Sequence, residues 1–304
     1  MKNNEGLEQQ VSLTKGWSLS AKVKDYMQLM KFTLSFTVVF SCVVCYQLAP
    51  NIAEINWKMT ILLFVAGLLV TGSANAINQA EEKDTDAVMK RTANRPVASG
   101  RMSVSEAWTF ATVAGIIGLV MMFYYFNLLS AIVSLISLGL YAFVYTPLKK
   151  INSISVLVGA FPGALPCLIG WTAATNTLST GGWILFGIQF LWQFPHFWAI
   201  AWVAHTDYSR AGFKLLPADK GPTTFTAVQS VLYAVLMIPV GLLPYFIGMS
   251  GIVSFIILII ANVFILWQCI RLYREMDIKA ARRVMFSSYI YLPIVLLALL
   301  ADKL

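Results

Sequence analysis

Residues 75–96 read NAINQAEEKDTDAVMKRTANRP, and this charged stretch follows directly on the apolar run Met59 to Val70. Within it Asn78, Glu82 and Asp86 stand at every fourth position, so a helix places all three on one face. Like charges at that spacing repel by roughly 0.2–0.5 kcal/mol on an exposed helix, and a cation beside them relieves the repulsion. The pattern therefore favours a metal site at the end of an apolar helix.

A solvated loop, in which acids and bases pair with one another, is the simpler interpretation of this stretch. The order of the residues argues against it, because the acids cluster at a helix C-terminal end, where the macrodipole disfavours them. Mg²⁺ commonly binds one or two carboxylates together with substrate phosphates. Arg91 and Arg95 follow the acids, and arginine presents forked donors to phosphate. We therefore interpret the stretch as a metal-bridged diphosphate site.

The composition predicts an integral membrane protein. Of the 304 residues, 58% are hydrophobic and 12% are charged, whereas ordinary soluble domains carry about 25% charged residues. The apolar residues form runs of about 20, the length that crosses roughly 30 Å of hydrocarbon as a helix. We expect one membrane domain over residues 1–304, an all-α polytopic bundle of about nine transmembrane helices. The expected spans are 32–49, 58–80, 105–124, 127–145, 152–173, 182–203, 226–246, 251–270 and 285–301.

The N-terminal residues 1–28 are expected to form a polar tail and an interfacial helix. Gly16 to Met30 mixes apolar side chains with Lys22, Lys24 and Asp25, a pattern typical of an amphipathic helix lying at the membrane surface.

The basic charge of the chain follows its expected topology. With a cytoplasmic N-terminus and nine spans, all of the 22 lysines and arginines except Lys58 and Lys303 fall on the cytoplasmic side. The net charge of +8 is then explained by the excess of lysine and arginine in the cytoplasmic loops of a protein embedded in the lipid bilayer. We therefore expect no nucleic-acid partner. The same arrangement places the segments 78–101, 145–150 and 205–220 on one face of the membrane. We expect a multi-pass protein of the inner (cytoplasmic) cell membrane.

Two further polar segments end apolar runs on that face. Tyr145 to Lys150 reads YTPLKK, and lysines at a helix end are usually snorkelling anchors. The other segment carries the two histidines of the chain, His196 and His205. A histidine within a span is a functional hypothesis by default, and a hydrogen-bonded interfacial histidine is the alternative.

Other features of the apolar runs have structural explanations. Cys42 and Cys45 have a CxxC spacing, but they lie in an expected span without a nearby histidine, so we interpret them as packing residues. The span 152–173 is rich in glycine and proline, which indicates close helix packing or a kink.

The acidic pattern resembles a known motif. Asn78-x-x-x-Glu82-x-x-x-Asp86 looks like the NxxxDxxxD motif of the UbiA superfamily of intramembrane prenyltransferases. The string from Asp84 to Thr92, followed by Asn94-Arg95-Pro96, is similar to its branch of protoheme IX farnesyltransferases, or heme O synthases. Trp192-Gln-Phe-Pro-His196 and Asp207-Tyr-x-x-Ala-Gly-x-x-x-Leu-Pro217 also resemble that branch, and Tyr145 and Lys149 match the YxxxK motif of the superfamily. Glu82 and Lys83 depart from the branch, which has Asp and Arg at these positions.

The resemblance implies a Mg²⁺-dependent prenyltransferase with heme B and farnesyl diphosphate as substrates. It would transfer the farnesyl group to a vinyl group of heme B, with addition of water, and give heme O and diphosphate for heme A biosynthesis. A downstream heme A synthase is the implied partner. The implied catalytic residues are Asn78, Glu82, Asp86, Tyr145, Lys149 and Asp207, and the implied metal ligands are Glu82, Asp86 and Asp207. Lys83, Arg91, Arg95 and Lys149 would bind diphosphate, and His196 and His205 would contact heme.

Three alternatives remain open from the sequence. Asp219 can substitute for a second acid beside Asp207, although the spacing does not require it. The acceptor can be an aromatic acid such as 4-hydroxybenzoate, or a chlorin, in place of heme. A transporter or heme carrier would use the same acids as an ion or substrate site.

Overall fold

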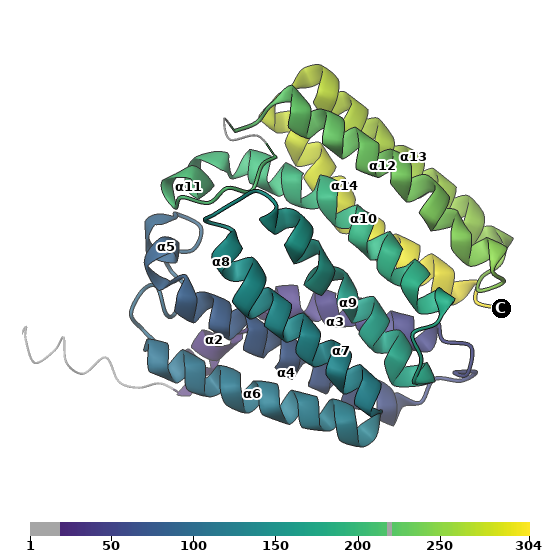
Figure 1. Cartoon of the computed structure of the whole chain (residues 1–304), viewed down its shortest axis with the longest axis horizontal. Helices are drawn as coiled ribbons and strands as arrows, with labels where there is room; N and C mark the ends of the chain where they lie inside the picture. Colours follow the sequence, from purple (N-terminus) through teal and green to yellow (C-terminus); the bar gives the residue numbers. More distant parts are fainter. Residues whose placement is uncertain (1–18, 218–220) are drawn as a thin grey trace, which may run out of the picture.

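The computed structural model describes residues 19–217 and 221–304. These residues form an all-helical bundle in which the long helices lie side by side (Figure 1). The helices are α2 (Leu19–Leu29), α3 (Phe32–Gln47), α4 (Trp57–Glu81), α5 (Lys83–Val88), α6 (Val104–Tyr125), α7 (Leu128–Gly139), the π-helix η1 (Leu140–Tyr145), α8 (Thr146–Leu148), α9 (Ser155–Thr175), α10 (Thr180–Val203), α11 (His205–Arg210), α12 (Thr224–Phe246), α13 (Ile252–Glu275) and α14 (Ile278–Ala301).

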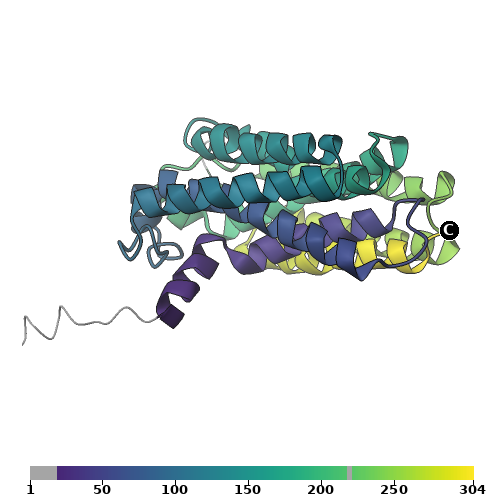
Figure 2. The same cartoon turned by 90° about the horizontal axis from the view of Figure 1, so that it is seen from below.

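The helices confirm the expected membrane bundle. Within the described ranges, eight helical segments are long and apolar enough to cross a membrane, with α7, η1 and α8 counted as one. The first expected span, 32–49, corresponds to α3, which has 16 residues. It becomes a ninth candidate span only together with α2, from which it is bent by 53°. Figure 2 shows α2 turned away from the bundle. The protein is a multi-pass membrane protein.

Small residues bring the helices close together. α4 packs along α6, where a Cβ atom on Gly118 would lie 2.8 Å from the Val70 side chain. In the same interface the Ser73 hydroxyl donates a hydrogen bond to the Ala111 carbonyl at 2.7 Å. α3 packs on α9, and a Cβ atom on Gly170 would lie 1.9 Å from the Cys42 carbonyl oxygen. Helices in lipid associate through close backbone approach of this kind. Lipid tails are as apolar as the helix surfaces, so the hydrophobic effect does not drive the helices together and close packing does.

The last two long helices extend further than the sequence predicts. The expected spans end at residue 270 and begin again at residue 285, yet α13 continues to Glu275 and α14 begins at Ile278. Met276 adopts the left-handed conformation with φ 49°, and the Asp277 carboxylate accepts a hydrogen bond from the Ala280 amide at 2.7 Å. A two-residue connection with a capping aspartate therefore suffices, and the charged side chains lie on helices.

Helix α2 lies within the segment for which an amphipathic interfacial helix is expected. Its Lys22 and Tyr26 both reach Glu106 at the start of α6, at 2.7 and 2.8 Å. Lys31 separates α2 from α3 with a left-handed backbone of φ 48°. The bend carries the chain from α2 into the bundle.

The C-terminus is bound at the end of the bundle opposite to α2, where α3 ends. Lys303 Nζ donates hydrogen bonds to the carbonyl oxygens of Gln47, Ala49 and Ile52, at 2.7, 2.7 and 2.6 Å. Partial burial lowers the pKa of Lys303 from its ordinary value. These bonds join the end of α3 to the end of α14.

Candidate active site

The acidic residues lie on one continuous helical face at the end of α4. α4 and α5 are separated only by Glu82, and the i to i+4 backbone bonds run through the break, from the Glu82 amide to the Asn78 carbonyl at 3.0 Å and from the Asp86 amide to the Glu82 carbonyl at 2.7 Å. Asn78, Glu82 and Asp86 are 1%, 4% and 1% exposed. The structure therefore brings the three predicted residues together and buries them.

Each buried carboxylate lies beside a basic side chain. Lys149 Nζ is 2.6 Å from Glu82 Oε1, and Arg95 donates to Asp86 Oδ2 at 2.6 Å. The Lys149–Glu82 contact is an ion pair between two buried side chains. Charges buried in this way need close partners, because isolated ones lose their hydration. Arg95 and Lys149 therefore converge on the predicted acids.

One carboxylate oxygen of Asp86 is left without a partner. Asp86 Oδ1 is buried and accepts no hydrogen bond from any residue in the described ranges. The neighbouring Thr92 hydroxyl donates at 2.8 Å to the Asp86 backbone carbonyl and not to Oδ1. A buried acceptor without a donor costs about 1–3 kcal/mol, and more when it is charged. This oxygen is suited to a cation.

Asn78 connects α4 to Lys31, the residue before α3, and to Thr146 of α8. Its Oδ1 atom accepts a hydrogen bond from Lys31 Nζ at 2.7 Å, and its Nδ2 atom donates to the Thr146 hydroxyl at 3.3 Å. Thr146 in turn donates to the Tyr141 carbonyl at 2.9 Å, where the helix is π-type. From the sequence, Lys31 is expected only as one of the basic residues on the cytoplasmic side. Its position at the polar start of a span, on the same membrane face as the acids, could have indicated that Lys31 contacts the acidic face.

Tyr145 and Lys149 lie together, as the YxxxK spacing predicts. Tyr145 ends the π-helix η1, and its ring packs against Gly159, where a Cβ atom would lie 2.6 Å from the ring. Lys149 Nζ lies 4.8 Å from the centroid of the Tyr145 ring and 5.3 Å from that of Phe213. Such contacts stabilise a cation against the ring faces. Neither the π-helix nor Phe213 was identified from the sequence.

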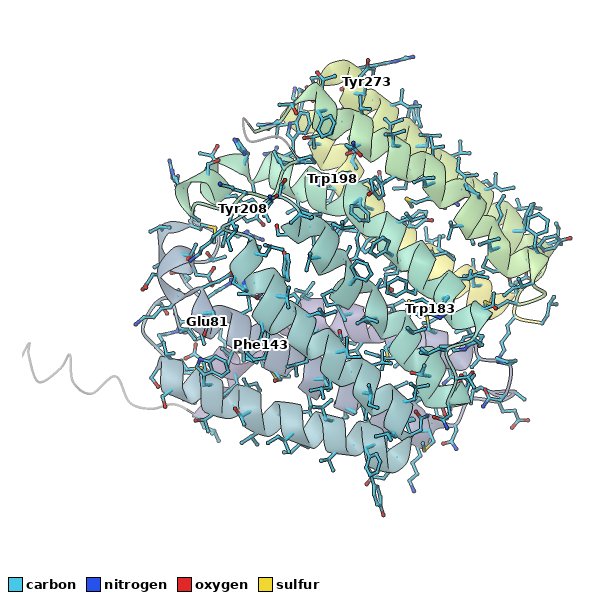
Figure 3. All side chains as sticks on the ribbon, viewed as in Figure 1. Glu81, Phe143, Trp183, Trp198, Tyr208 and Tyr273 are labelled. Carbon is cyan, nitrogen blue, oxygen red and sulfur yellow. The ribbon has the colours of Figure 1, made fainter. Side chains whose placement is uncertain are left out.

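The loop that follows α5 contacts α11, the short helix in which the predicted segment Asp207 to Pro217 begins. Arg91 donates to the Tyr208 hydroxyl at 2.8 Å, and its guanidinium lies 5.4 Å from the centroid of the Tyr208 ring. The Lys214 amide donates to the Lys149 carbonyl at 2.8 Å. Figure 3 places Tyr208 at the end of the bundle where α5 and α11 meet. Both predicted motifs therefore lie at the same end of the molecule.

Two predicted site residues lie outside this constellation. Lys83 follows Glu82 directly, so it is exposed on a different face of the helix. Asp207 is half-buried in the first turn of α11. Among residues 19–217 and 221–304, no three or more histidine, cysteine or acidic side chains are close enough to hold one metal ion. The expected trio of Glu82, Asp86 and Asp207 is thus not assembled. Asp207 lies on the separate short helix α11, and it is Tyr208 of that helix that contacts the loop after α5, through Arg91. Asp219 lies outside the described residues.

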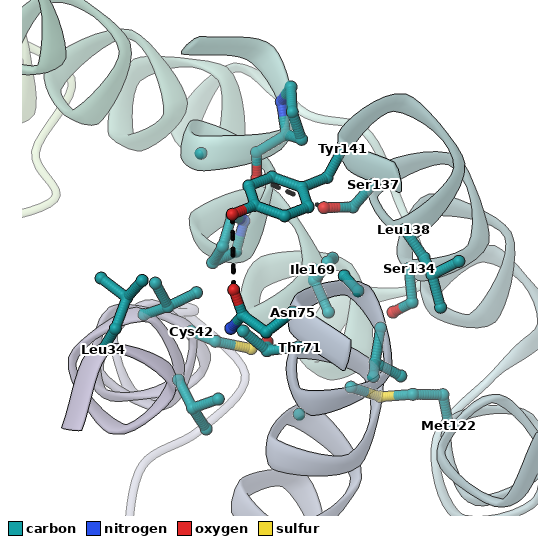
Figure 4. Close-up of a pocket in the computed structure, with 18 residues that line it drawn as sticks. Leu34, Cys42, Thr71, Asn75, Met122, Ser134, Ser137, Leu138, Tyr141 and Ile169 are labelled. Carbon is teal, nitrogen blue, oxygen red and sulfur yellow. Dashed lines mark hydrogen bonds between the residues drawn. The ribbon is translucent and has the colours of Figure 1, made fainter. Parts of the chain in front are cut away.

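An apolar cavity begins one helical turn before Asn78. Its volume is about 100 Å³, and it lies among α3, α4, α7 and α9 (Figure 4). Asn75 and Tyr141 line it, and the Tyr141 hydroxyl donates to Asn75 Oδ1 at 3.4 Å. The other lining side chains are mostly apolar and include Leu34, Val38, Thr71, Met122, Leu138 and Ile169. The buried acids and bases thus lie next to an apolar cavity in the bundle.

The glycine- and proline-rich helix α9 forms one wall of this cavity. Pro162 and Pro166 lie inside α9, and both line the cavity. Because Pro166 has no N–H, it cannot bond the Pro162 carbonyl, and the Ser137 hydroxyl donates to that oxygen at 3.2 Å instead. Cys42 also lines the cavity, and it is a free thiol, as Cys45 is, in agreement with their packing interpretation.

The two histidines have different surroundings. His196 is buried in α10, with its Nδ1 atom 2.8 Å from the Ser288 hydroxyl of α14 and its ring stacked on Trp192 at 4.5 Å. His205 is half-buried and begins α11, and its ring lies 3.4 Å from the Ser209 hydroxyl. Neither histidine hydrogen-bonds to the acidic face.

Comparison with known proteins identifies related sequences over almost the whole chain. Residues 38–291 match the sequence profile of the UbiA prenyltransferase family. A protein of Cytophaga hutchinsonii named protoheme IX farnesyltransferase is 44% identical over 285 residues, which cover 94% of this chain and 99% of the relative. One of the same name from Flavobacterium psychrophilum is 42% identical, with coverages of 92% and 94%.

Solved structures share the fold. A chain described as digeranylgeranylglyceryl phosphate synthase superposes with a TM-score of 0.76 at 22% identity and covers 93% of this chain and 98% of its own length. A UbiA homolog from Archaeoglobus fulgidus, solved with GPP and Mg²⁺, has a TM-score of 0.65 at 14% identity, with coverages of 90% and 99%. At these identities the likeness concerns the fold alone.

Proposed function

The chain belongs to the UbiA prenyltransferase family, and we propose that it transfers a farnesyl group from farnesyl diphosphate to a vinyl group of heme B. Water adds in the same reaction, and the products are heme O and diphosphate. The names of relatives that are 40–44% identical over most of the chain support the choice of heme as acceptor.

One observation supports the prenyl diphosphate most directly. The buried set of Glu82, Asp86, Lys149 and Arg95 lies beside an apolar cavity that begins at Asn75. A prenyl diphosphate has the same two-part character, since a highly charged head group is attached to an apolar chain. We propose that the head group binds at the acids and bases, and that the chain enters the cavity.

Mg²⁺ is the cofactor that we propose for this site. Asp86 Oδ1, a buried carboxylate oxygen with no donor among the described residues, fits a hard cation, and Glu82 supplies a second carboxylate. Two carboxylates suffice, because Mg²⁺ usually completes its coordination with water and substrate phosphates. Asp207 would hold a second ion. When bound, the metal neutralises charge on the departing diphosphate.

The basic residues would bind the diphosphate as it leaves. Arg95 and Lys149 already converge on the acids, and Arg91 is held nearby by Tyr208. We propose that these three, with Lys83, donate hydrogen bonds to the phosphate oxygens as the bond between the allylic carbon and oxygen breaks. The Tyr145 ring would face the allylic cation, and Asn78 would orient Glu82 and Asp86. The cavity excludes water until the vinyl carbon has attacked.

The acceptor would bind on the α10 and α11 side of the site. We propose that His196 contacts the heme, and that His205 is a secondary contact at the start of α11. Water then adds to the cation formed at the vinyl group and loses a proton, which leaves a hydroxyl group.

The proposal includes a location and a partner. We propose the inner (cytoplasmic) cell membrane as its location. The distribution of lysine and arginine favours an orientation with the N-terminus and the loops of the site in the cytoplasm. We expect heme O to pass to a heme A synthase.

A reconstitution experiment separates this function from its rivals. Purified protein is incubated with farnesyl diphosphate and Mg²⁺, with heme B and 4-hydroxybenzoate offered together as acceptors. We expect a farnesylated hydroxyethyl heme and unchanged 4-hydroxybenzoate. Prenylation of the aromatic acid alone would indicate another enzyme of the family, and bound but unchanged heme would indicate a carrier.

A further inference from the structure

Ser288 and His196 form a hydrogen bond whose direction is fixed by a third group. The Ser288 hydroxyl donates to the Met285 carbonyl at 2.6 Å, and His196 Nδ1 lies 2.8 Å from the same hydroxyl oxygen. A serine hydroxyl has one hydrogen and two lone pairs. Because that hydrogen is directed to Met285, the hydroxyl oxygen accepts from His196, and the histidine proton is on Nδ1.

The second ring nitrogen of His196 then carries a free lone pair. In a neutral imidazole protonated on Nδ1, Nε2 is the acceptor and the nitrogen able to bind a metal. Within the part of the chain that the structure describes, Nε2 has no hydrogen-bond partner. His196 therefore presents an unpaired acceptor in the middle of an apolar helix.

Trp192 holds both partners in place. Its indole nitrogen donates to the Ser288 backbone carbonyl at 2.9 Å, and its ring stacks on His196 at 4.5 Å with an interplanar angle of 20°. The imidazole is therefore fixed by a ring contact from α10 and a hydrogen bond from α14. Histidines that bind metals are oriented in the same way, by a partner for the N–H that does not face the metal.

Two further aromatic side chains pack against His196. The edge of its ring meets Tyr289 and Phe197, both at 5.2 Å between centroids. Tyr289 is 48% exposed on α14. The Tyr289 ring therefore leads from the buried His196 to the exposed face of α14.

We propose that Ser288 is a positioning residue that holds His196 in the Nδ1–H tautomer, so that His196 Nε2 binds the iron of the heme substrate. The inference rests on the proposed function, because it takes heme B as the acceptor. It adds a ligand atom and an orienting residue.

Heme titration of the purified protein tests this directly. Ferric heme B is added to wild type, His196→Ala, Ser288→Ala and Ser288→Thr, and the Soret band and the electron paramagnetic resonance spectrum are recorded. We expect the spectrum of a histidine-ligated heme in wild type and its loss in His196→Ala. Ser288→Ala should weaken heme binding by about 10-fold or more, and Ser288→Thr, which keeps the hydroxyl, should restore it.

Two controls separate this role from a structural one and from failure of the proposed function. Each variant must retain wild-type affinity for farnesyl diphosphate, which shows that the bundle is folded. His196→Gly with added imidazole should recover the ligated spectrum, which a packing role would not produce. If His196→Ala leaves the heme spectrum unchanged, or Ser288→Ala binds heme as wild type does, the inference is wrong even when heme O is formed. If the spectra behave as expected and no heme O appears, the proposed function fails and the ligand assignment stands.

Discussion

Lys149 Nζ lies 2.6 Å from Glu82 Oε1, and both side chains are buried at the end of the bundle. The contact joins the residue that follows α4 to the residue that follows the short helix α8. Lys149 also lies over the rings of Tyr145 and Phe213, so its position is fixed from several sides. This pair is therefore both a structural contact and a part of the proposed site.

Removal of one partner of this pair should destabilise the protein. Lys149→Met leaves Glu82 buried without its cation, which typically costs 3–5 kcal/mol, so we expect a loss of about that size. The double variant Lys149→Met with Glu82→Gln removes both charges and should recover most of the stability, while turnover stays absent. Thermal unfolding in detergent, combined with the heme O assay, measures both. Equal stability of the single and double variants would show that the two charges do not interact.

Asp86→Asn should abolish turnover and leave heme binding intact. The substitution removes the charge at the buried Oδ1 atom, while the amide still fills the same space. We expect at least a 100-fold loss of heme O formation, the size of effect seen when one electrostatic group is removed from an active site. Asp84→Asn is the matched control, because Asp84 is exposed in the same short helix. A loss of heme binding in Asp86→Asn would place this motif at the other substrate.

Filling the apolar cavity should discriminate between prenyl chains. Ala74 lines the cavity on α4, one residue before Asn75. Ala74→Leu occupies part of the cavity of about 100 Å³, so the KM for farnesyl diphosphate should rise while the shorter geranyl diphosphate is affected less. Steady-state kinetics with both donors measures the ratio. An unchanged ratio would mean that the chain binds elsewhere.

Lys303→Met should lower stability without an effect on the chemistry. The lysine donates three hydrogen bonds to backbone carbonyls at the end of the bundle opposite the acids. Hydrogen bonds of charged groups contribute about 1.5–3 kcal/mol each, and partial exposure of this lysine reduces the sum, so we expect a loss of about 2 kcal/mol. Lys58→Met, at an exposed position, is the control. A normal melting temperature for Lys303→Met would show that the contact contributes nothing.

Much of the fold was predictable from the sequence because lipid leaves few choices. Apolar runs of membrane-spanning length become helices, since backbone groups in hydrocarbon must be paired within the segment. The spacing of Asn78, Glu82 and Asp86 was sufficient to place them on one face, because the helical ladder continues through the break at Glu82. The pairing of Tyr145 with Lys149 followed from the same helical geometry.

The remaining features depend on tertiary contacts that spacing does not reveal. The π-helix η1 and the ring of Phe213 beside Lys149 come from packing between distant segments. Lys31 reaches Asn78 only because the bend after α2 directs it into the bundle. The tautomer that we propose for His196 follows from the hydrogen bond that Ser288 donates to the Met285 carbonyl. No sequence pattern predicts that bond.

The mass of the tetrapyrrole product tests the central claim most directly. Wild type and Asp86→Asn are incubated in parallel with heme B, farnesyl diphosphate and Mg²⁺, and the hemes are extracted and analysed by mass spectrometry. We predict that wild type yields heme B plus one farnesyl group and one hydroxyl, while Asp86→Asn returns heme B unchanged. Unmodified heme from an active, folded wild-type preparation, or the same product from both proteins, would contradict the account.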